Sequence, residues 1–312
     1  MKNVLLLQYR ILKQLTMNKT NRFLTFFVVL LALLGTVACE QPVIDGDATD
    51  GKGTGEANVI LRLTNFEQTP FQTRAQADVA QLCSRINIAV FDSEGTKVKS
   101  VAQKEGDEQF GVAAMTLSTG TYQLVVIAHN CDGSATITST EKVTFPNNKV
   151  TDTFYYYGDL LVTEEPQDYD LTLTRAVAKF QLVLTDDEIP ANVAKLRFYY
   201  TGGSSTFSPL AGYGCVKSKQ TEIRTVSGND TRTFDIYTMP HAEDGVLKLT
   251  ITAFDADENI VRMRDFDEVP VTRNQVTRYT GSFFGEGGGK PGDANFHLTA
   301  DPEWDSVNDY SL

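Results

Sequence analysis

A succession of short alternating segments, separated by turn residues, is the feature that most constrains how this chain can fold. Residues 58–66 alternate, with Val59, Leu61 and Leu63 on one face, and residues 85–92 alternate in the same way before an Asp-Ser-Glu-Gly turn. Period-two alternation between turn signals is typical of half-buried β-strands. No stretch after residue 57 has the periodicity of an amphipathic helix of useful length. The sequence therefore predicts an all-β protein.

The spacing of these segments predicts two domains. Residues 121–130 form a nearly continuous apolar run, as in the central strand of a sandwich, and residues 164–168 form a polar break that contains a proline. Strand patterning restarts at once after that break. Because the resulting units hold roughly 100 to 140 residues of short strands, two β-sandwiches are favoured over one large barrel. We place the first sandwich at residues 58–166 and the second at residues 167–312.

The amino-terminal region has the order of a secretory signal peptide. Lys19 and Arg22 form a short cationic region ahead of an apolar run at residues 23–38. That run of about 16 residues is shorter than the roughly 20 that a membrane-spanning helix needs. We therefore assign residues 1–38 to a signal peptide. The first 16 residues add nothing that a signal requires, which makes Met17 a candidate for the true start.

The signal peptide ends in a motif that resembles a bacterial lipobox, Gly35-Thr36-Val37-Ala38-Cys39. Small residues precede a cysteine that would be lipidated and become the first residue of the exported protein. Thr36 departs from the usual leucine three positions before the cysteine, and an ordinary signal peptide with a chance cysteine is the alternative. The lipobox reading predicts a protein held in a membrane through Cys39.

The segment that follows, residues 39–57, is rich in Asp, Gly and Thr and has almost nothing to bury. Such composition predicts a flexible tether between the lipid and the first sandwich. Its acidic residues resemble the surface-export signals of Bacteroidetes lipoproteins, although they are scattered, and a plain solvated linker explains them equally well. They are Glu40, Asp45, Asp47 and Asp50.

Charge and the placement of reactive residues argue against nucleic-acid binding and against catalysis. The chain has 40 acidic and 28 basic side chains, a formal net charge of −12, so it would repel phosphate backbones. His129, His241 and His297 are far apart, and none has a partner at zinc-ligand spacing. The glycine run at residues 285–292 lacks the Lys-Ser/Thr spacing of a phosphate loop. We expect no cofactor, no metal site and no enzymatic activity.

Two further patterns have plain structural explanations. Asp255, Asp257 and Asn259 partly match a calcium-binding loop, but a β-hairpin turn explains them better because the glycine and the glutamate of such a loop are missing. The aromatic clusters at residues 155–157 and 199–200 could face a sugar. Alternation buries some members of such clusters in any sandwich, so core packing is the expected role.

The cysteines allow one disulfide. Cys83 lies just before the predicted strand at residues 85–91 and Cys131 just after the one at residues 121–129. If these strands are antiparallel neighbours, both sulfurs lie at the same edge and a bond is geometrically reasonable. The alternative is three buried free thiols. Cys215 has no partner in sequence and is expected to be a small apolar filler.

A detached carboxy-terminal segment, residues 293–312, follows the glycine run. It begins with a short alternating stretch and contains the only tryptophan of the chain. A lone apolar strand after a glycine hinge either folds back onto its own domain or pairs with a neighbouring molecule. The residues that would mediate such pairing are Phe296, Leu298, Ala300 and Trp304.

The second half of the chain resembles the FimB-type fimbrial anchor subunits of Bacteroidetes. The matching elements are residues 171–203, residues 233–240 and residues 269–285. The last of these looks like the closing hairpin of that family. The resemblance implies two transthyretin-like sandwiches, a lipid anchor in the outer membrane, a place at the base of a fimbrium and no catalytic residues. Related lipoproteins instead lie at the tip or act as free-standing adhesins.

These observations predict a surface lipoprotein that ties a fimbrium to the outer membrane. Residues 293–312 would insert as a donated strand into the first stalk subunit, which is the expected partner. The alternative is a tip or free-standing adhesin that binds a host glycan or protein through exposed aromatic side chains.

Overall fold

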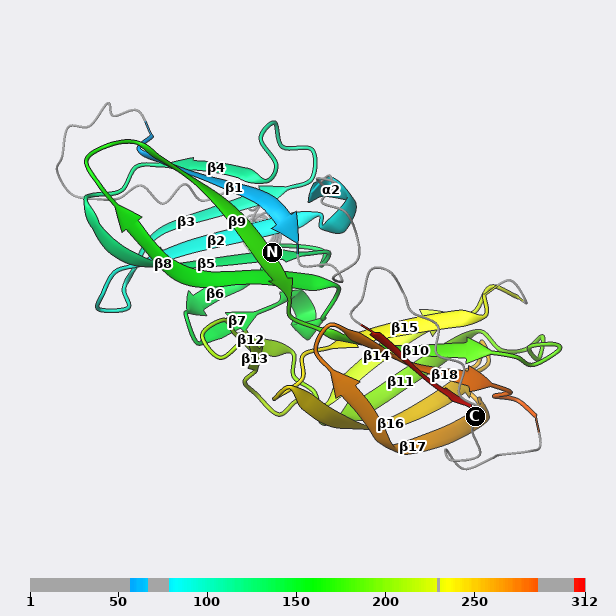
Figure 1. The fold of residues 1–312 in the computed structure, drawn as a ribbon. Helices are drawn as coiled ribbons and strands as arrows, with labels where there is room; N and C mark the ends of the chain where they lie inside the picture. The colour runs from blue at the N-terminus through cyan, green and yellow to red at the C-terminus, as the bar shows by residue number, and fades with distance from the viewer. Residues whose placement is uncertain (1–56, 67–78, 229–230, 286–305, 312) are drawn as a thin grey trace, which may run out of the picture. The chain divides into compact units, whose positions relative to one another are not determined.

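A computed structural model describes residues 57–66, 79–228 and 231–285 and the backbone of residues 306–311. Nearly all of the regular secondary structure in this part is β-strand (Figure 1). Its helical elements are short, such as the four-residue α2 and the three-residue 3₁₀ turn η1, so the prediction of an all-β protein is confirmed for the described residues. None of the helices found there is long and apolar enough to span a membrane.

The first half contains the elements up to β9, with their bounds as follows: β1 (Val59–Phe66), α2 (Val79–Leu82), β2 (Arg85–Phe91), β3 (Lys97–Lys104), β4 (Val112–Met115), β5 (Gly120–His129), β6 (Thr136–Ser139), β7 (Lys142–Thr144), the 3₁₀ turn η1 (Pro146–Asn148), β8 (Thr153–Val162) and β9 (Gln167–Arg175). The second half contains the rest: β10 (Ala178–Leu184), β11 (Lys195–Thr201), β12 (Thr206–Ser208), β13 (Tyr213–Gly214), β14 (Gln220–Thr225), β15 (Thr233–Thr238), β16 (Asp244–Phe254), β17 (Ile260–Thr272), β18 (Gln275–Gly281) and β19 (Ser306–Ser311).

The first half is a sandwich made from one folded sheet. Its seven strands run in the order β3-β2-β5-β8-β9-β1-β4, and β8 and β9 share only two register pairs, where the sheet turns a corner. The inward residues of β1, Val59, Leu61 and Leu63, pack against those of β2 and β5. Alternation in the sequence therefore identified the buried face of β1 correctly.

The second half is a sandwich of two four-stranded sheets, β15-β10-β18-β19 and β14-β11-β16-β17. Apolar side chains from both sheets fill the space between them, including Phe180 of β10, Phe198 of β11 and Tyr279 of β18. The predicted hairpin at the end of this half differs from the structure. β17 pairs with β16, whereas β18 pairs with β10 and β19, so the turn at Arg273 and Asn274 carries the chain from one sheet to the other.

The boundary between the halves lies one strand later than the sequence indicated. β9 was expected to open the second sandwich, but it belongs to the first sheet, where it pairs with β1. The polar break at residues 164–168 contains most of the turn between β8 and β9 and the first two residues of β9. The second sandwich therefore begins at Ala178 rather than at residue 167.

A third apolar cluster connects the halves. It covers the outer face of β2 and β5 and includes Phe207, Met239 and Val276 from the second half. A small sheet, β13-β12-β7-β6, also crosses the boundary, because β7 of the first half pairs with β12 of the second. The two halves thus share one apolar cluster and one small sheet.

His129 is buried within the first half in its neutral form. The backbone N–H of Cys131 donates to its Nδ1 (3.1 Å), so the proton lies on Nε2, which donates to Asn87 Oδ1 (3.0 Å). Burial, and then the positive charge of Arg85, lower the pKa of His129 to about 4. A neutral histidine with both nitrogens bonded suits a structural role and leaves no free nitrogen for a metal.

The depressed pKa of His129 predicts that the first sandwich loses stability in mild acid. On acidification, His129 of the unfolded chain takes up a proton near pH 6.5, whereas His129 of the folded protein does so only near pH 4. The free energy of unfolding should therefore fall as the pH is lowered through this window. The loss should approach about 3 kcal/mol, at 1.36 kcal/mol per pKa unit. Urea melts at pH 7 and pH 4.5 measure it. A His129→Gln variant should have a flatter profile, and equal wild-type stability at both pH values would refute the assignment.

Candidate functional site

The carboxy-terminal strand β19 lies at the open edge of the second sandwich (Figure 1). It pairs in parallel with β18, from Ser306 opposite Gln275 to Ser311 opposite Thr280. Twenty residues separate Gly285 from Ser306 in the sequence, and the parallel pairing requires this connection to lead back to the start of β18. The end of the segment therefore folds back onto its own domain, which was one of the two alternatives.

The remaining residues predicted for attachment lie outside the described part of the chain. Cys39 and the tether precede it, and the four candidate strand-donor residues fall between Gly285 and β19: Phe296, Leu298, Ala300 and Trp304. Their roles stay predictions.

The point where the chain leaves β18 is held by the carboxylate of Asp186. This side chain accepts hydrogen bonds from the hydroxyl of Ser282 (2.6 Å) and from the backbone N–H groups of Phe283 (2.7 Å), Phe284 (2.9 Å) and Gly285 (3.2 Å). Asp186 follows β10 and is only 9% exposed. Burial alone would raise its pKa, but these four bonds outweigh it and lower the pKa below the ordinary value. The carboxylate is therefore ionised at neutral pH and closes the turn after β18.

Two arginines of β17 bind the same turn from its other side. Arg264 Nε donates to the carbonyl of Phe283 (2.8 Å), and the guanidinium of Arg262 donates to the carbonyl of Gly285 (2.7 Å). The ring of Phe283 is fully buried beneath them. Both the amides and the carbonyls of this turn are thus bonded to neighbouring elements, and we name residues 282–285 with Asp186, Arg262 and Arg264 the exit clamp. The exit clamp fixes the place from which the carboxy-terminal segment leaves the sandwich.

The structure does not form the predicted disulfide. Cys83 and Cys131 are free thiols, and they pack into different apolar clusters on opposite faces of the sheet. Antiparallel pairing of β2 with β5 is confirmed, but it brings the strand ends together without aiming the side chains at each other. Cys215 is exposed rather than buried, so its expected role as an apolar filler is wrong.

These positions predict the reactivity of the thiols. In the chain from residue 40 to Leu312, a maleimide should label Cys215 alone while the protein is folded. Cys83 and Cys131 should react only in guanidinium, because both are buried, and burial followed by the charge of Glu105 raises the pKa of Cys83 to about 12. Mass spectrometry counts the adducts. A Cys83–Cys131 linked peptide, or two rapid adducts in the native protein, would contradict the structure.

The described residues form no metal centre. Within residues 57–66, 79–228 and 231–285 there is no cluster of three His, Cys, Asp or Glu side chains that could hold a metal. Asp255 caps the turn between β16 and β17 instead, by accepting from the N–H groups of Asp257 (3.0 Å) and Asn259 (2.8 Å). The interpretation of this loop as a hairpin turn is confirmed.

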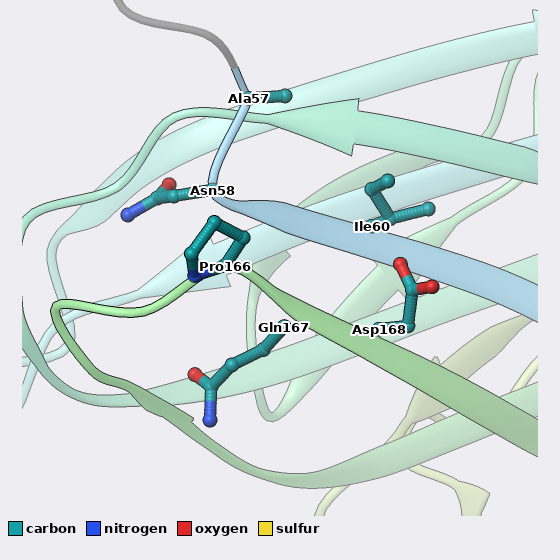
Figure 2. A pocket seen from close by; sticks show the side chains of 6 residues that line it. All are labelled: Ala57, Asn58, Ile60, Pro166, Gln167 and Asp168. Carbon is teal, nitrogen blue, oxygen red and sulfur yellow. The ribbon is translucent and has the colours of Figure 1, made fainter.

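A shallow hollow of about 300 Å³ lies where β1 and β9 begin (Figure 2). It is lined by Ala57, Asn58, Ile60, Pro166, Gln167 and Asp168. Its single carboxylate, on Asp168, forms an exposed ion pair with Arg62 (3.5 Å). The hollow marks the place where the first sandwich receives the chain.

The aromatic clusters behave mainly as core. Tyr155 and Tyr157 pack against the cluster that connects the halves, Tyr156 packs against the core of the first sandwich, and Tyr200 is buried with its hydroxyl on the carbonyl of Tyr237 (3.0 Å). Tyr199 is the exception, because alternation places it on the outer face of β11, where it is 39% exposed.

Several solved structures are similar to this chain at low sequence identity. A candidate adhesin from Bacteroides ovatus is 14% identical over 67% of this chain and 76% of its own, with a TM-score of 0.48. A second from the same species is 16% identical over 69% and 83%, with a TM-score of 0.47. The fimbrial anchor protein Mfa2 from Porphyromonas gingivalis is 11% identical over 68% and 83%, with a TM-score of 0.36.

A comparison with curated protein sequences finds no match. A family model does match the chain, from residue 50 to residue 310, which includes both sandwiches and all but the last residue of β19. The chain therefore belongs to the family of unknown function DUF6562.

Proposed function

We propose that this protein is an outer-membrane lipoprotein that anchors a fimbrium to the cell surface. Its two sandwiches would be transthyretin-like, with lipid on Cys39 at one end and residues 293–312 joined to the first stalk subunit at the other. The function is structural and uses no catalytic residue. Main-chain pairing would supply affinity, and alternate side chains would set the register.

The observation that carries this proposal is the position of β19. Among the described strands it is the outermost of its sheet, and the ladder that holds it there is the one with β18. A strand bonded on one side can exchange its partner without opening either apolar core. The preceding exit clamp keeps the sandwich closed up to Gly285, so the segment beyond it can leave while the fold remains intact.

The amino-terminal end supports the same assignment. Two or more acyl chains on one cysteine give lasting membrane attachment, which a single chain does not. The acidic tether has no apolar face that would bind a bilayer by itself. With the amino terminus held by lipid, the carboxy terminus is the end left to join a partner.

A surface adhesin is the second candidate, and one observation favours it. Tyr199, Ile223 and Met263 lie on the outer face of the sheet β14-β11-β16-β17 and are 39%, 52% and 53% exposed. Exposed apolar side chains gathered on one sheet face are typical of binding surfaces. An adhesin would use this face and would not need residues 293–312.

A charge substitution in the predicted donor stretch tests the anchor. Replacing both Phe296 and Leu298 by Asp should detach fimbriae from the cells, because the insertion would bury two charges in the stalk subunit. The matched control is Asn295→Asp with Thr299→Asp, which adds the same charge on the alternate positions of the stretch. Electron microscopy and fractionation of fimbriae between cells and medium measure the result.

The control variant should keep its fimbriae attached. Detachment in both variants would point to charge alone, and attachment in both would contradict strand donation through this stretch.

A further inference from the structure

Each sandwich receives and releases the chain through two neighbouring strands that run in the same direction. In the first sandwich the incoming strand is β1 and the outgoing strand is β9 (Figure 1). They pair in parallel from Val59 opposite Gln167 to Phe66 opposite Leu173, with one irregularity after Leu63. The chain therefore arrives at one end of this ladder and departs at the other.

The second sandwich repeats the arrangement. Its incoming strand is β10 and its outgoing strand is β18, which pair in parallel from Lys179 opposite Val276 to Leu184 opposite Gly281. Both strands lie inside their sheet, since β15 and β19 cover their other edges. Antiparallel strand pairs outnumber parallel pairs by roughly two- to three-fold in sheets. It is therefore distinctive that the entering strand and the leaving strand form a parallel pair in both sandwiches.

This topology decides how the protein responds to a pull on its ends. In a parallel pair the two points of attachment lie at opposite ends of the ladder, so tension slides one strand along the other and stretches all its hydrogen bonds together. In an antiparallel pair both points lie at one end, and the bonds break one after another. We infer that both sandwiches are built to resist tension between the amino and carboxy termini of this chain.

Two groups of side chains reinforce the points where tension would leave the ladders. Arg175, at the end of β9, is 1% exposed and binds both carboxylate oxygens of Asp152 (2.8 and 3.0 Å) and the side-chain oxygen of Asn274 (3.0 Å). Its guanidinium also lies 4.6 Å from the ring centroid of Phe154. Force leaving β9 is therefore shared with β8 and with the β17–β18 turn before it reaches β10.

The exit clamp has the corresponding position in the second sandwich. It begins one residue after β18 and attaches the outgoing chain to Asp186, which follows the incoming strand β10. A pull on Gly285 thus acts on the β17 arginines and on the end of β10 as well as on β18. The two fastenings differ in chemistry, but each lies where its outgoing strand ends.

The biological use of this property rests on the proposed function, because an anchor carries tension between its lipid and its fimbrium. The mechanical property itself follows from the described strands alone. Forced unfolding depends on the rate of unfolding rather than on equilibrium stability, so it has to be measured by pulling.

Single-molecule force spectroscopy of the chain from residue 40 to Leu312 tests the inference. One geometry attaches handles at the two termini. The control keeps the amino-terminal handle and places the other on a bioorthogonal side chain at Glu165, in the turn just before β9. The control pulls β1 and β9 from the same end, so it opens the same ladder bond by bond in the same folded protein.

End-to-end pulling should unfold the first sandwich at a force higher by about twofold or more than the control geometry, since its unfolding rate under force is lower. The event is identified by the release of roughly 400 Å of chain, at about 3.5 Å a residue. Equal forces, or a higher force in the control, would overturn the inference.

Asp186→Asn supplies an independent measurement on the second sandwich. It should lower the end-to-end unfolding force of that sandwich and leave the Glu165 geometry unchanged, and an unaltered end-to-end force would remove the exit clamp from the account. If the wild-type protein does not hold fimbriae but unfolds at a higher force end to end than in the Glu165 geometry, the proposed function alone is rejected. If the wild-type protein holds fimbriae but unfolds at equal forces in the two geometries, this inference alone is rejected.

Discussion

Replacing Cys39 with alanine should transfer nearly all of the protein from the membrane fraction to the soluble fraction, or leave it with an uncleaved signal peptide. Under the proposed function, acyl chains on Cys39 would hold the protein in the membrane, at about 0.8 kcal/mol for each buried CH₂ group, and the tether has no apolar face to replace them. Detergent phase partitioning with an immunoblot measures the distribution.

The control for that experiment is Cys215→Ala, which removes an exposed thiol of the second sandwich and should leave the protein in the detergent phase. A Cys39→Ala protein that still partitions with detergent after its signal has been cleaved would show that the lipoprotein assignment is wrong.

Deleting residues 293–312 should release most fimbriae into the medium while the truncated protein stays folded in the membrane. The deletion removes the predicted donor stretch and β19 but leaves both sandwich cores and the exit clamp in place. The cost to the fold is one edge ladder, so thermal unfolding should shift by a few degrees at most. The measurement compares fimbrial antigen in cells and medium, with the thermal melt of the truncated protein as its control. Fimbriae that stay attached at wild-type length would contradict strand donation.

The strands and their buried faces could be predicted because alternation is a local property. Ile86, Ile88 and Val90 were expected on the buried face of β2, and they lie in the core of the first sandwich. Alternation did not predict that the opposite face of β2 is buried as well. Ala89 and Phe91 are buried as well, since the cluster that connects the halves covers the outer side of the same strand.

Strand pairing could not be predicted, because register and direction depend on residues far apart in the chain. The pairing of β1 with β9 joins segments about 110 positions apart, and nothing in either segment identifies the other. That pairing is why β9 lies in the sheet of the first half and not in a sheet of the second. The same difficulty misplaced the disulfide, since adjacency of β2 and β5 was correct but the faces of Cys83 and Cys131 were not.

The exit clamp is the part of the candidate site that sequence reasoning missed. Asp186 reads as an ordinary turn residue after a strand, and its partner Ser282 is 96 positions away. Arg262 and Arg264 read as exposed charges on an edge strand, although both donate to carbonyls of the same turn. Only the fold brings these side chains together.

Association with a fimbrial polymer is the most direct test of the account. Membranes should be extracted gently with a non-denaturing detergent, and the protein should be captured through a tag placed in the tether, away from residues 293–312. The account predicts that intact fimbriae co-purify with the wild-type protein, that the protein lies at one end of each fibre by immunogold labelling, and that the Phe296→Asp, Leu298→Asp variant captures none. Wild-type protein that purifies free of fimbrial subunits, from cells that display attached fimbriae, would contradict it.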